Sequence, residues 1–225
     1  MKRAWFKASV ASVVAMAALA GCSSSPPAPD WQMNAKGALE RSVAAWLEGN
    51  SRVELAEFTR ARSEAASTGQ VDVVARVELT RCAARTAALV FDACEGFGKL
   101  SADASPAERA YADYIAGKST PQGIALLPPQ HRAVAVVLAG SGDVGAAQVQ
   151  AIEDPLARLV ASGAAFRASK AAPDLVKTAV DTASAQGWRR PLLAWLGVQA
   201  RLAEKAGDAE GAARARRRIA LVEGG

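Results

Sequence analysis

Histidine and cysteine are scarce in this sequence. It contains a single histidine, His131, and three cysteines among 225 residues. Zinc sites of the usual kind are built from several histidine nitrogens and cysteine sulfurs. With so few of these ligands, we expect no metal site in the protein.

Motifs of catalytic residues are also lacking. Nothing links His131 to a nucleophilic serine or to an orienting aspartate, as a catalytic triad requires. Pro128 and Pro129 precede His131 and predict that it lies in the first turn of a helix. The carboxylates have no common spacing, and we assign no catalytic residue among them: Asp92, Glu95, Asp113, Glu153 and Asp154.

Positive charge is in excess only at the start of the chain. The sequence has 27 lysines and arginines against 22 acidic residues. Three of the basic residues are Lys2, Arg3 and Lys7, so that 24 basic and 22 acidic residues remain beyond them. A nucleic-acid-binding domain carries a much stronger basic footprint, and we expect no nucleic-acid partner.

Residues 1–21 have the pattern of an export signal. The basic start is followed by an uncharged apolar stretch over residues 8–20, which is shorter than the ~20 residues of a membrane-spanning helix. The stretch ends in Leu19-Ala20-Gly21-Cys22, which resembles the lipobox of bacterial lipoproteins. This resemblance implies cleavage between Gly21 and Cys22, and fatty acyl chains such as palmitate on Cys22. The alternative is an ordinary secretory signal with an incidental Cys22.

The resemblance also implies a location. Ser23, and not aspartate, follows Cys22, and in lipoproteins of enteric bacteria this favours the outer membrane. Several acyl chains on one residue give firm anchoring, so we expect a lipid-anchored protein at the periplasmic face of the outer membrane. The chain as a whole resembles proteobacterial lipoproteins, a resemblance that implies no activity.

The remaining chain divides into a tether and a domain. Residues 22–30 are rich in serine and proline and cannot form a core. Residues 31–225 form the helical domain, and they are numerous enough for one well-filled core or for two small ones. The loop 118–128 is the candidate for an internal boundary within it.

Cys82 and Cys94 are the two cysteines that lipidation leaves free. A helix through both would hold their Cα atoms roughly 18 Å apart at ~1.5 Å per residue, whereas a disulfide needs ~4.4–6.8 Å. Disulfides persist in exported proteins. We therefore predict a Cys82–Cys94 disulfide with a chain reversal around residues 89–92; the alternative is two buried free thiols.

The domain contains the start and stop signals of helices, and no alternating strand pattern is evident. Apolar residues recur at helical spacing, as Leu39, Val43 and Trp46 do. Capping boxes at Ser51–Glu54 and Ser105–Glu108 predict helix starts. Prolines predict further starts at Pro155, Pro173 and Pro191. Glycines predict helix ends at Gly49, Gly69, Gly117, Gly187 and Gly207.

Internal similarity suggests how these helices are arranged. Ala45-Trp46-Leu47 recurs as Ala194-Trp195-Leu196. The stretch 193–221 resembles one tetratricopeptide repeat in its small and apolar positions, but Ala203, Arg216 and Ile219 depart from that pattern. We expect an all-α fold of stacked helical hairpins, an α-solenoid. The alternative is an irregular helical bundle.

Residues 140–145 match the G-x-G-x-x-G pattern of dinucleotide-binding loops. The preceding apolar run begins with two prolines, as a helix does, and no strand ending in an acid follows. We therefore interpret the segment as a glycine-rich turn between helices and expect no cofactor.

The densest basic patch is near the C-terminus. A solvated helix face is the simpler interpretation, because basic residues complement the helix dipole there. The functional alternative is contact with anionic lipid head groups or cell-wall polymers. Its residues are Arg214, Arg216, Arg217 and Arg218. Tryptophans 46, 188 and 195 have apolar helical neighbours, and we expect core anchors and not a sugar-binding platform.

Export, lipid anchoring and stacked helices without a catalytic constellation point to a binding function. Helical hairpins form concave surfaces that suit segments of other proteins. We expect a non-catalytic adaptor or scaffold that binds another cell-envelope protein. The alternative is an envelope ligand- or glycan-binding protein or an enzyme, which requires His131 to meet carboxylates in a cleft.

Overall fold

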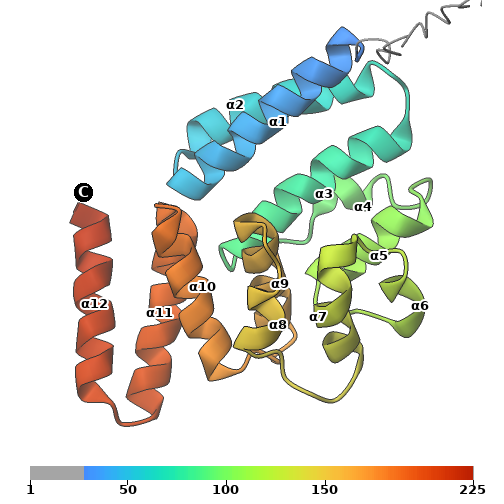
Figure 1. Cartoon of the computed structure of the whole chain (residues 1–225). Helices are drawn as coiled ribbons and strands as arrows, with labels where there is room; N and C mark the ends of the chain where they lie inside the picture. The colour runs from blue at the N-terminus through green and yellow to red at the C-terminus, as the bar shows by residue number, and fades with distance from the viewer. Residues whose placement is uncertain (1–27, 225) are drawn as a thin grey trace, which may run out of the picture.

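The computed structural model describes residues 28–224, which form twelve α-helices and no strand (Figure 1). A single parallel bridge joins Val144 and Ala171. The helices are α1 (Asp30–Glu48), α2 (Ser51–Ala66), α3 (Val71–Ala87), α4 (Glu95–Gly98), α5 (Pro106–Ile115), α6 (Pro121–Ile124), α7 (Pro129–Ala139), α8 (Ala146–Gln150), α9 (Pro155–Arg167), α10 (Pro173–Ala185), α11 (Arg189–Lys205) and α12 (Ala209–Gly224).

Most of the predicted helix ends are confirmed. All five glycines that predict helix ends have positive φ, from 65° at Gly69 to 100° at Gly49, a conformation that costs glycine least. The Ser105–Glu108 capping box forms at the start of α5. The Ser51–Glu54 box does not: Asn50 caps α2 by accepting a hydrogen bond from Val53 N.

The all-α fold class is confirmed, and its arrangement combines the two expected types. Consecutive helices pack together in the pairs α1–α2, α10–α11 and α11–α12, as in helical hairpins. However, α3 also packs on α9, and α1 contacts α11. Repeats of a solenoid contact only their neighbours, so these long-range contacts give the domain the character of an irregular bundle. In Figure 1, α3 runs between the α1–α2 hairpin above it and α9 below it.

The main hydrophobic core brings together α3, α5, α7, α9, α10 and α11. Its largest members, Tyr114, Leu159 and Trp195, are completely buried. The core includes Ile115 and Val134, which lie on either side of the loop 118–128, and this loop contains the short helix α6. A smaller cluster lies between α2 and α3.

Candidate functional site

The Cys82–Cys94 disulfide is present, with 5.8 Å between the two Cα atoms. Helix α3 ends at Ala87, and the chain reverses through Leu89, which has a positive φ of 58°. This is the reversal that the spacing of the cysteines requires. The predicted lipidation and cleavage residues, Cys22 and Gly21, lie outside the described residues.

His131 lies in the first turn of α7, as predicted, but it is only 2% exposed. Its Nδ1 shares a hydrogen bond of 3.1 Å with the Tyr114 hydroxyl, and the Tyr111 ring centroid is 5.7 Å away. Burial lowers the pKa of His131 to about 4, although the charge of Asp154 acts in the opposite direction. The test of the enzyme alternative is whether His131 gathers with carboxylates in one cleft; His131 is buried and lines neither of the two hollows described below.

The glycine-rich segment 140–145 joins two helices, α7 and α8, as predicted. Its polar groups bind other parts of the domain. Lys170 Nζ donates to the carbonyl of Gly140, Val144 N donates to the Lys170 carbonyl at 2.7 Å, and Ala172 N donates to the Val144 carbonyl at 3.0 Å. The segment is therefore a structural turn that the α9–α10 connection holds in place.

The four C-terminal arginines lie exposed on α12, and glutamates already neutralise two of them. Arg214 pairs with Glu210 at 2.5 Å, and Arg216 pairs with Glu204. Arg189, at the start of α11, donates to the carbonyl of Glu223 at the end of α12, so these two helices are antiparallel. Charge on this face is thus partly balanced within the protein.

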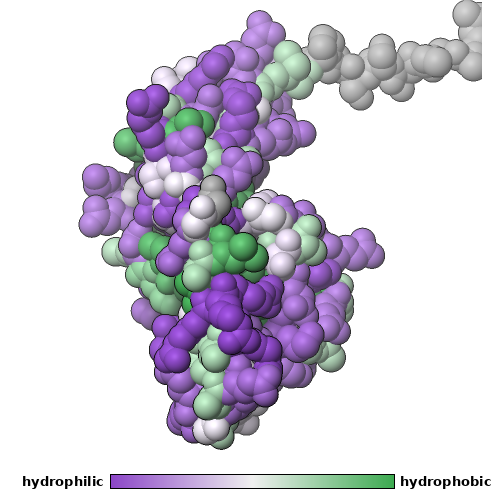
Figure 2. All heavy atoms as spheres, turned by 90° about the vertical axis from the view of Figure 1, so that its left-hand side faces the viewer, coloured by the Kyte–Doolittle hydropathy of each residue, from purple (hydrophilic) through white to green (hydrophobic). Residues whose placement is uncertain are grey.

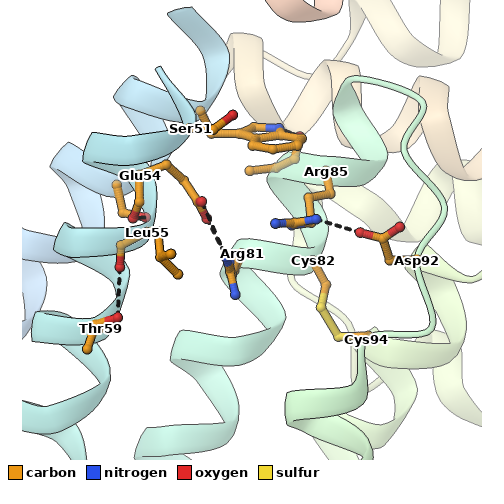
Figure 3. Close-up of polar contacts among 12 residues, drawn as sticks. Ser51, Glu54, Leu55, Thr59, Arg81, Cys82, Arg85, Asp92 and Cys94 are labelled. Carbon is orange, nitrogen blue, oxygen red and sulfur yellow. Dashed lines mark hydrogen bonds and ion pairs between the residues drawn. A yellow bond between two sulfur atoms is a disulfide. The ribbon is translucent and has the colours of Figure 1, made fainter. Parts of the chain in front are cut away.

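Arginines and glutamates form a ladder between α2 and α3 that the sequence pattern did not reveal. Glu54 is 3% exposed and accepts two hydrogen bonds from Arg81, at 2.6 and 3.2 Å. Arg81 lies over the Phe58 ring, 4.1 Å from its centroid. A second pair joins Arg62 and Glu78 at 2.7 Å. Figure 3 shows Arg81 directed from α3 toward Glu54 on α2.

Next along α3, Arg85 turns away from α2 and pairs with Asp92 at 2.5 Å (Figure 3). Arg85 and Arg190 both lie over the Trp46 ring, 4.6 and 3.8 Å from its centroid. Arg190 also donates to the Trp46 carbonyl at 2.7 Å. This contact joins α11 to α1 across 144 positions of the chain. Because Arg85 and Arg190 both bind partners within the domain, we interpret these arginines around Trp46 as structural.

Two of the three predicted tryptophan anchors are in the core. Trp195 is fully buried and Trp46 is 6% exposed, and their indole nitrogens donate to the carbonyls of Ala87 and Ala84. Trp188 is only half-buried. Trp188 lines a hollow at the surface, and in this it differs from the two buried tryptophans.

Two hollows adjoin on the surface beside α3, and together we call them the trough. The first, of about 470 Å³, is lined mainly by apolar residues of α3, α5 and the α6–α7 connection, among them Leu79, Tyr111 and Leu126. The second, of about 530 Å³, lies between α1 and the start of α9 and includes Leu39, Val43, Leu156 and Trp188. Thr80 lines both hollows, which establishes that they are neighbours.

Among residues 28–224, the trough is a large concavity with a mainly apolar lining, whereas a hollow of similar size, about 520 Å³, is lined largely by the charged side chains between α2, α3 and α4. Figure 2 shows a predominantly hydrophilic surface whose outline is indented between the α1–α2 hairpin and the rest of the domain. Binding sites are typically concave and lined mainly by apolar side chains with a few polar groups, and the trough has this composition. The trough is therefore the candidate functional site.

Other site types find no support in the described part of the chain. Within residues 28–224, no three histidine, cysteine, aspartate or glutamate side chains gather as a metal site requires. None of the helices described is long and apolar enough to cross a membrane. No protein-family model, curated protein or solved structure matches the chain.

Proposed function

We propose that this protein is a lipid-anchored adaptor at the periplasmic face of the outer membrane, and that it binds another cell-envelope protein through the trough. The trough is the observation that carries the proposal. Its lining is mostly aliphatic and aromatic, and most of it comes from the helices α1, α3, α5 and α9, with parts from the α6–α7 and α10–α11 connections. Such a concave surface suits a segment of another protein.

The proposed location draws on two further features. The sequence Leu19-Ala20-Gly21-Cys22 supports export and lipid attachment at Cys22. The Cys82–Cys94 disulfide fits an oxidising compartment such as the periplasm. The tether of residues 23–29 then connects the lipid to the helical domain.

Crosslinking in living cells tests this function. The full-length protein with a C-terminal tag is crosslinked, purified from membranes and analysed by mass spectrometry, and a Cys22→Ser variant serves as the control that cannot be lipidated. We expect one dominant partner protein that is recovered only with the lipidated form. Recovery of glycan fragments or lipids alone, or of nothing, would contradict the adaptor function.

A direct assay tests the anchor. Cells are supplied with an alkyne-labelled fatty acid, and the purified protein is probed for the label. We expect labelling of the native protein and none of the Cys22→Ser variant. Equal absence of label in both would favour an ordinary secretory signal.

A further inference from the structure

The two hollows of the trough are mainly apolar, but each is also lined by charged side chains. Three carboxylates and two basic groups line the trough. Glu108 pairs with Arg76 at 2.8 Å, and Glu40 pairs with Lys36 at 3.8 Å. The remaining carboxylate is Asp154, and among the described residues no cation lies within 4.0 Å of it. The trough therefore has one net negative charge, which is located on Asp154.

Asp154 belongs to the hollow beside α1, where it lies next to Pro155 and Leu156, and this hollow shares Thr80 with the other one. The charge of Asp154 also acts on Tyr111, which lines the other hollow: burial is the main reason that the pKa of Tyr111 is raised, and Asp154 adds to it. One oxygen of Asp154 caps α9 by accepting a hydrogen bond from Ala157 N at 2.6 Å. The other oxygen has no protein partner, and the residue is exposed.

We propose that the trough binds a partner segment in which one lysine or arginine lies between two apolar side chains, with the basic group paired to Asp154. The apolar side chains enter the two hollows, one near Leu39 and Leu156 and the other near Tyr111 and Leu126. This inference rests on the proposed adaptor function and specifies the chemistry of the partner. Charge complementarity of this kind fixes the register of a bound segment more than it adds affinity.

Other occupants match this chemistry less well. The tether, Ser23 to Pro29, contains no basic residue and no large apolar side chain. A fatty acyl chain has no cation for Asp154. A second copy of this chain offers only one of the two apolar side chains required, because Leu221 is the one large apolar residue exposed beside the basic residues among the described residues of α12; measurement of the oligomeric state tests that occupant.

Peptide binding provides the direct test. The lipidated full-length mature protein is placed in nanodiscs, and short fluorescent peptides with leucines on both sides of a central residue are titrated by anisotropy. The central residue is lysine, alanine or glutamate. We expect the lysine peptide to bind most tightly and the glutamate peptide least tightly. Equal binding of the three peptides, or no binding of any, would overturn the proposal.

Two matched variants identify the charge responsible. Asp154→Asn retains the cap of α9, because asparagine is as good an N-cap as aspartate. It is expected to weaken binding of the lysine peptide about fivefold, the range of a solvent-exposed ion pair, and to leave the alanine peptide unchanged. Glu153→Gln removes the neighbouring charge, which does not line the trough, and should change neither. A lysine preference that survives in Asp154→Asn would overturn the proposal.

Site-specific photo-crosslinking separates this inference from the adaptor function. A photoreactive residue replaces Leu39 in the trough or, as control, Leu55, which is exposed on α2 (Figure 3). We expect a partner adduct at position 39 only, through a peptide that has a basic residue between apolar ones. An adduct at position 55 alone retains an adaptor but refutes the trough. A second copy, or an acyl chain, recovered at position 39 refutes the proposed occupant. A partner adduct at neither position, with none recovered by general crosslinking, contradicts the adaptor itself.

Discussion

Helix α3 contacts α2 on one side and α9 on the other, and the two contacts are built from different side chains. Toward α2, it contributes Arg81 and Glu78 to ion pairs with Glu54 and Arg62, and these pairs lie beside the smaller apolar cluster between the two helices. Toward α9, the contact is made by small residues. A Cβ atom added to Gly163 of α9 would lie 2.1 Å from the Thr86 carbonyl oxygen of α3.

This difference determines how each contact responds to change. An interface of small residues is close-packed, so added or removed volume is felt directly. A contact made by ion pairs depends on whether each charge retains its partner, and volume matters less. Four predictions test the comparison.

The largest loss of stability is expected from truncation of a fully buried aromatic side chain in the core. Trp195 is fully buried, its ring lies edge-on to Phe166 at 5.7 Å, and its indole donates to the Ala87 carbonyl. Trp195→Ala should lower the free energy of unfolding by about 3–5 kcal/mol, as for other buried aromatic residues. Urea unfolding monitored by circular dichroism measures it. Trp31→Ala, at a half-buried position on α1, is the control and should cost much less; equal costs would refute the assignment of the core.

Protonation of His131 in the apolar core should also lower the free energy of unfolding. The pKa of His131 in the folded protein is about 4, below its ordinary value of 6.5, so between these values the unfolded chain binds a proton that the folded chain does not. The contribution of His131 to the free energy of unfolding is therefore fully present above pH 6.5 and decreases as the pH falls toward 4. The loss reaches at most about 3 kcal/mol, at 1.36 kcal/mol per pKa unit.

The His131→Phe variant isolates this term. Its unfolding free energy, measured by urea titration at several pH values, should lack the part of the decrease between pH 6.5 and 4 that is specific to the native protein. Parallel curves for the two proteins would show that His131 is accessible to protons in the folded state.

The α3–α9 contact itself is tested by adding one methyl group. Gly163→Ala places a Cβ against backbone and not against a flexible side chain, so the helices must separate. We expect a loss of about 1–3 kcal/mol in unfolding free energy, although alanine is otherwise the better helix former. Gly197→Ala on α11 is the matched control, because its nearest contact is the end of the flexible Arg201 side chain at 3.7 Å. Stabilisation by both variants would contradict the close approach.

The sequence predicted what local rules determine. Glycines mark helix ends because few other residues adopt positive φ, and prolines mark starts at Pro155 and Pro173 because the first N–H needs no partner. The start predicted at Pro191 was two residues late, because α11 begins at Arg189 and Pro191 still lies in its first turn, where no partner for its nitrogen is needed. The spacing of Cys82 and Cys94 required a chain reversal, and the disulfide followed. In each case the physical cause lies within a few residues of the feature.

Features that depend on distant partners were not predictable in this way. Glu54 belongs to a capping-box pattern, yet in the structure it pairs with Arg81 of the next helix. The sequence placed His131 in a helical turn but did not indicate its burial against Tyr114. The trough is formed by α1, α3, α5 and α9 together, and no local pattern specifies which faces of these helices meet. The short helices α4, α6 and α8 were also missed, since too few residues carry their periodicity.

The smallest effect is expected for the ion pairs between α3 and α2. There it should appear as a coupling energy between two charged side chains, which the contact between α3 and α9 does not contain. Glu54→Gln leaves Arg81 without its carboxylate, and because the Arg81 side chain is 23% exposed, we expect a loss of about 1–2 kcal/mol and not the ~3–5 kcal/mol of a fully buried pair. The double variant Glu54→Gln with Arg81→Met should cost clearly less than the sum of the two single changes, with a coupling of about 1 kcal/mol. The same cycle on Lys177 and Asp181, an exposed pair on α10, should give only ~0.3–0.5 kcal/mol. Unfolding free energies of all variants measure both couplings. If the two cycles give equal values, burial of Glu54 adds nothing, and the two sides of α3 differ only in composition.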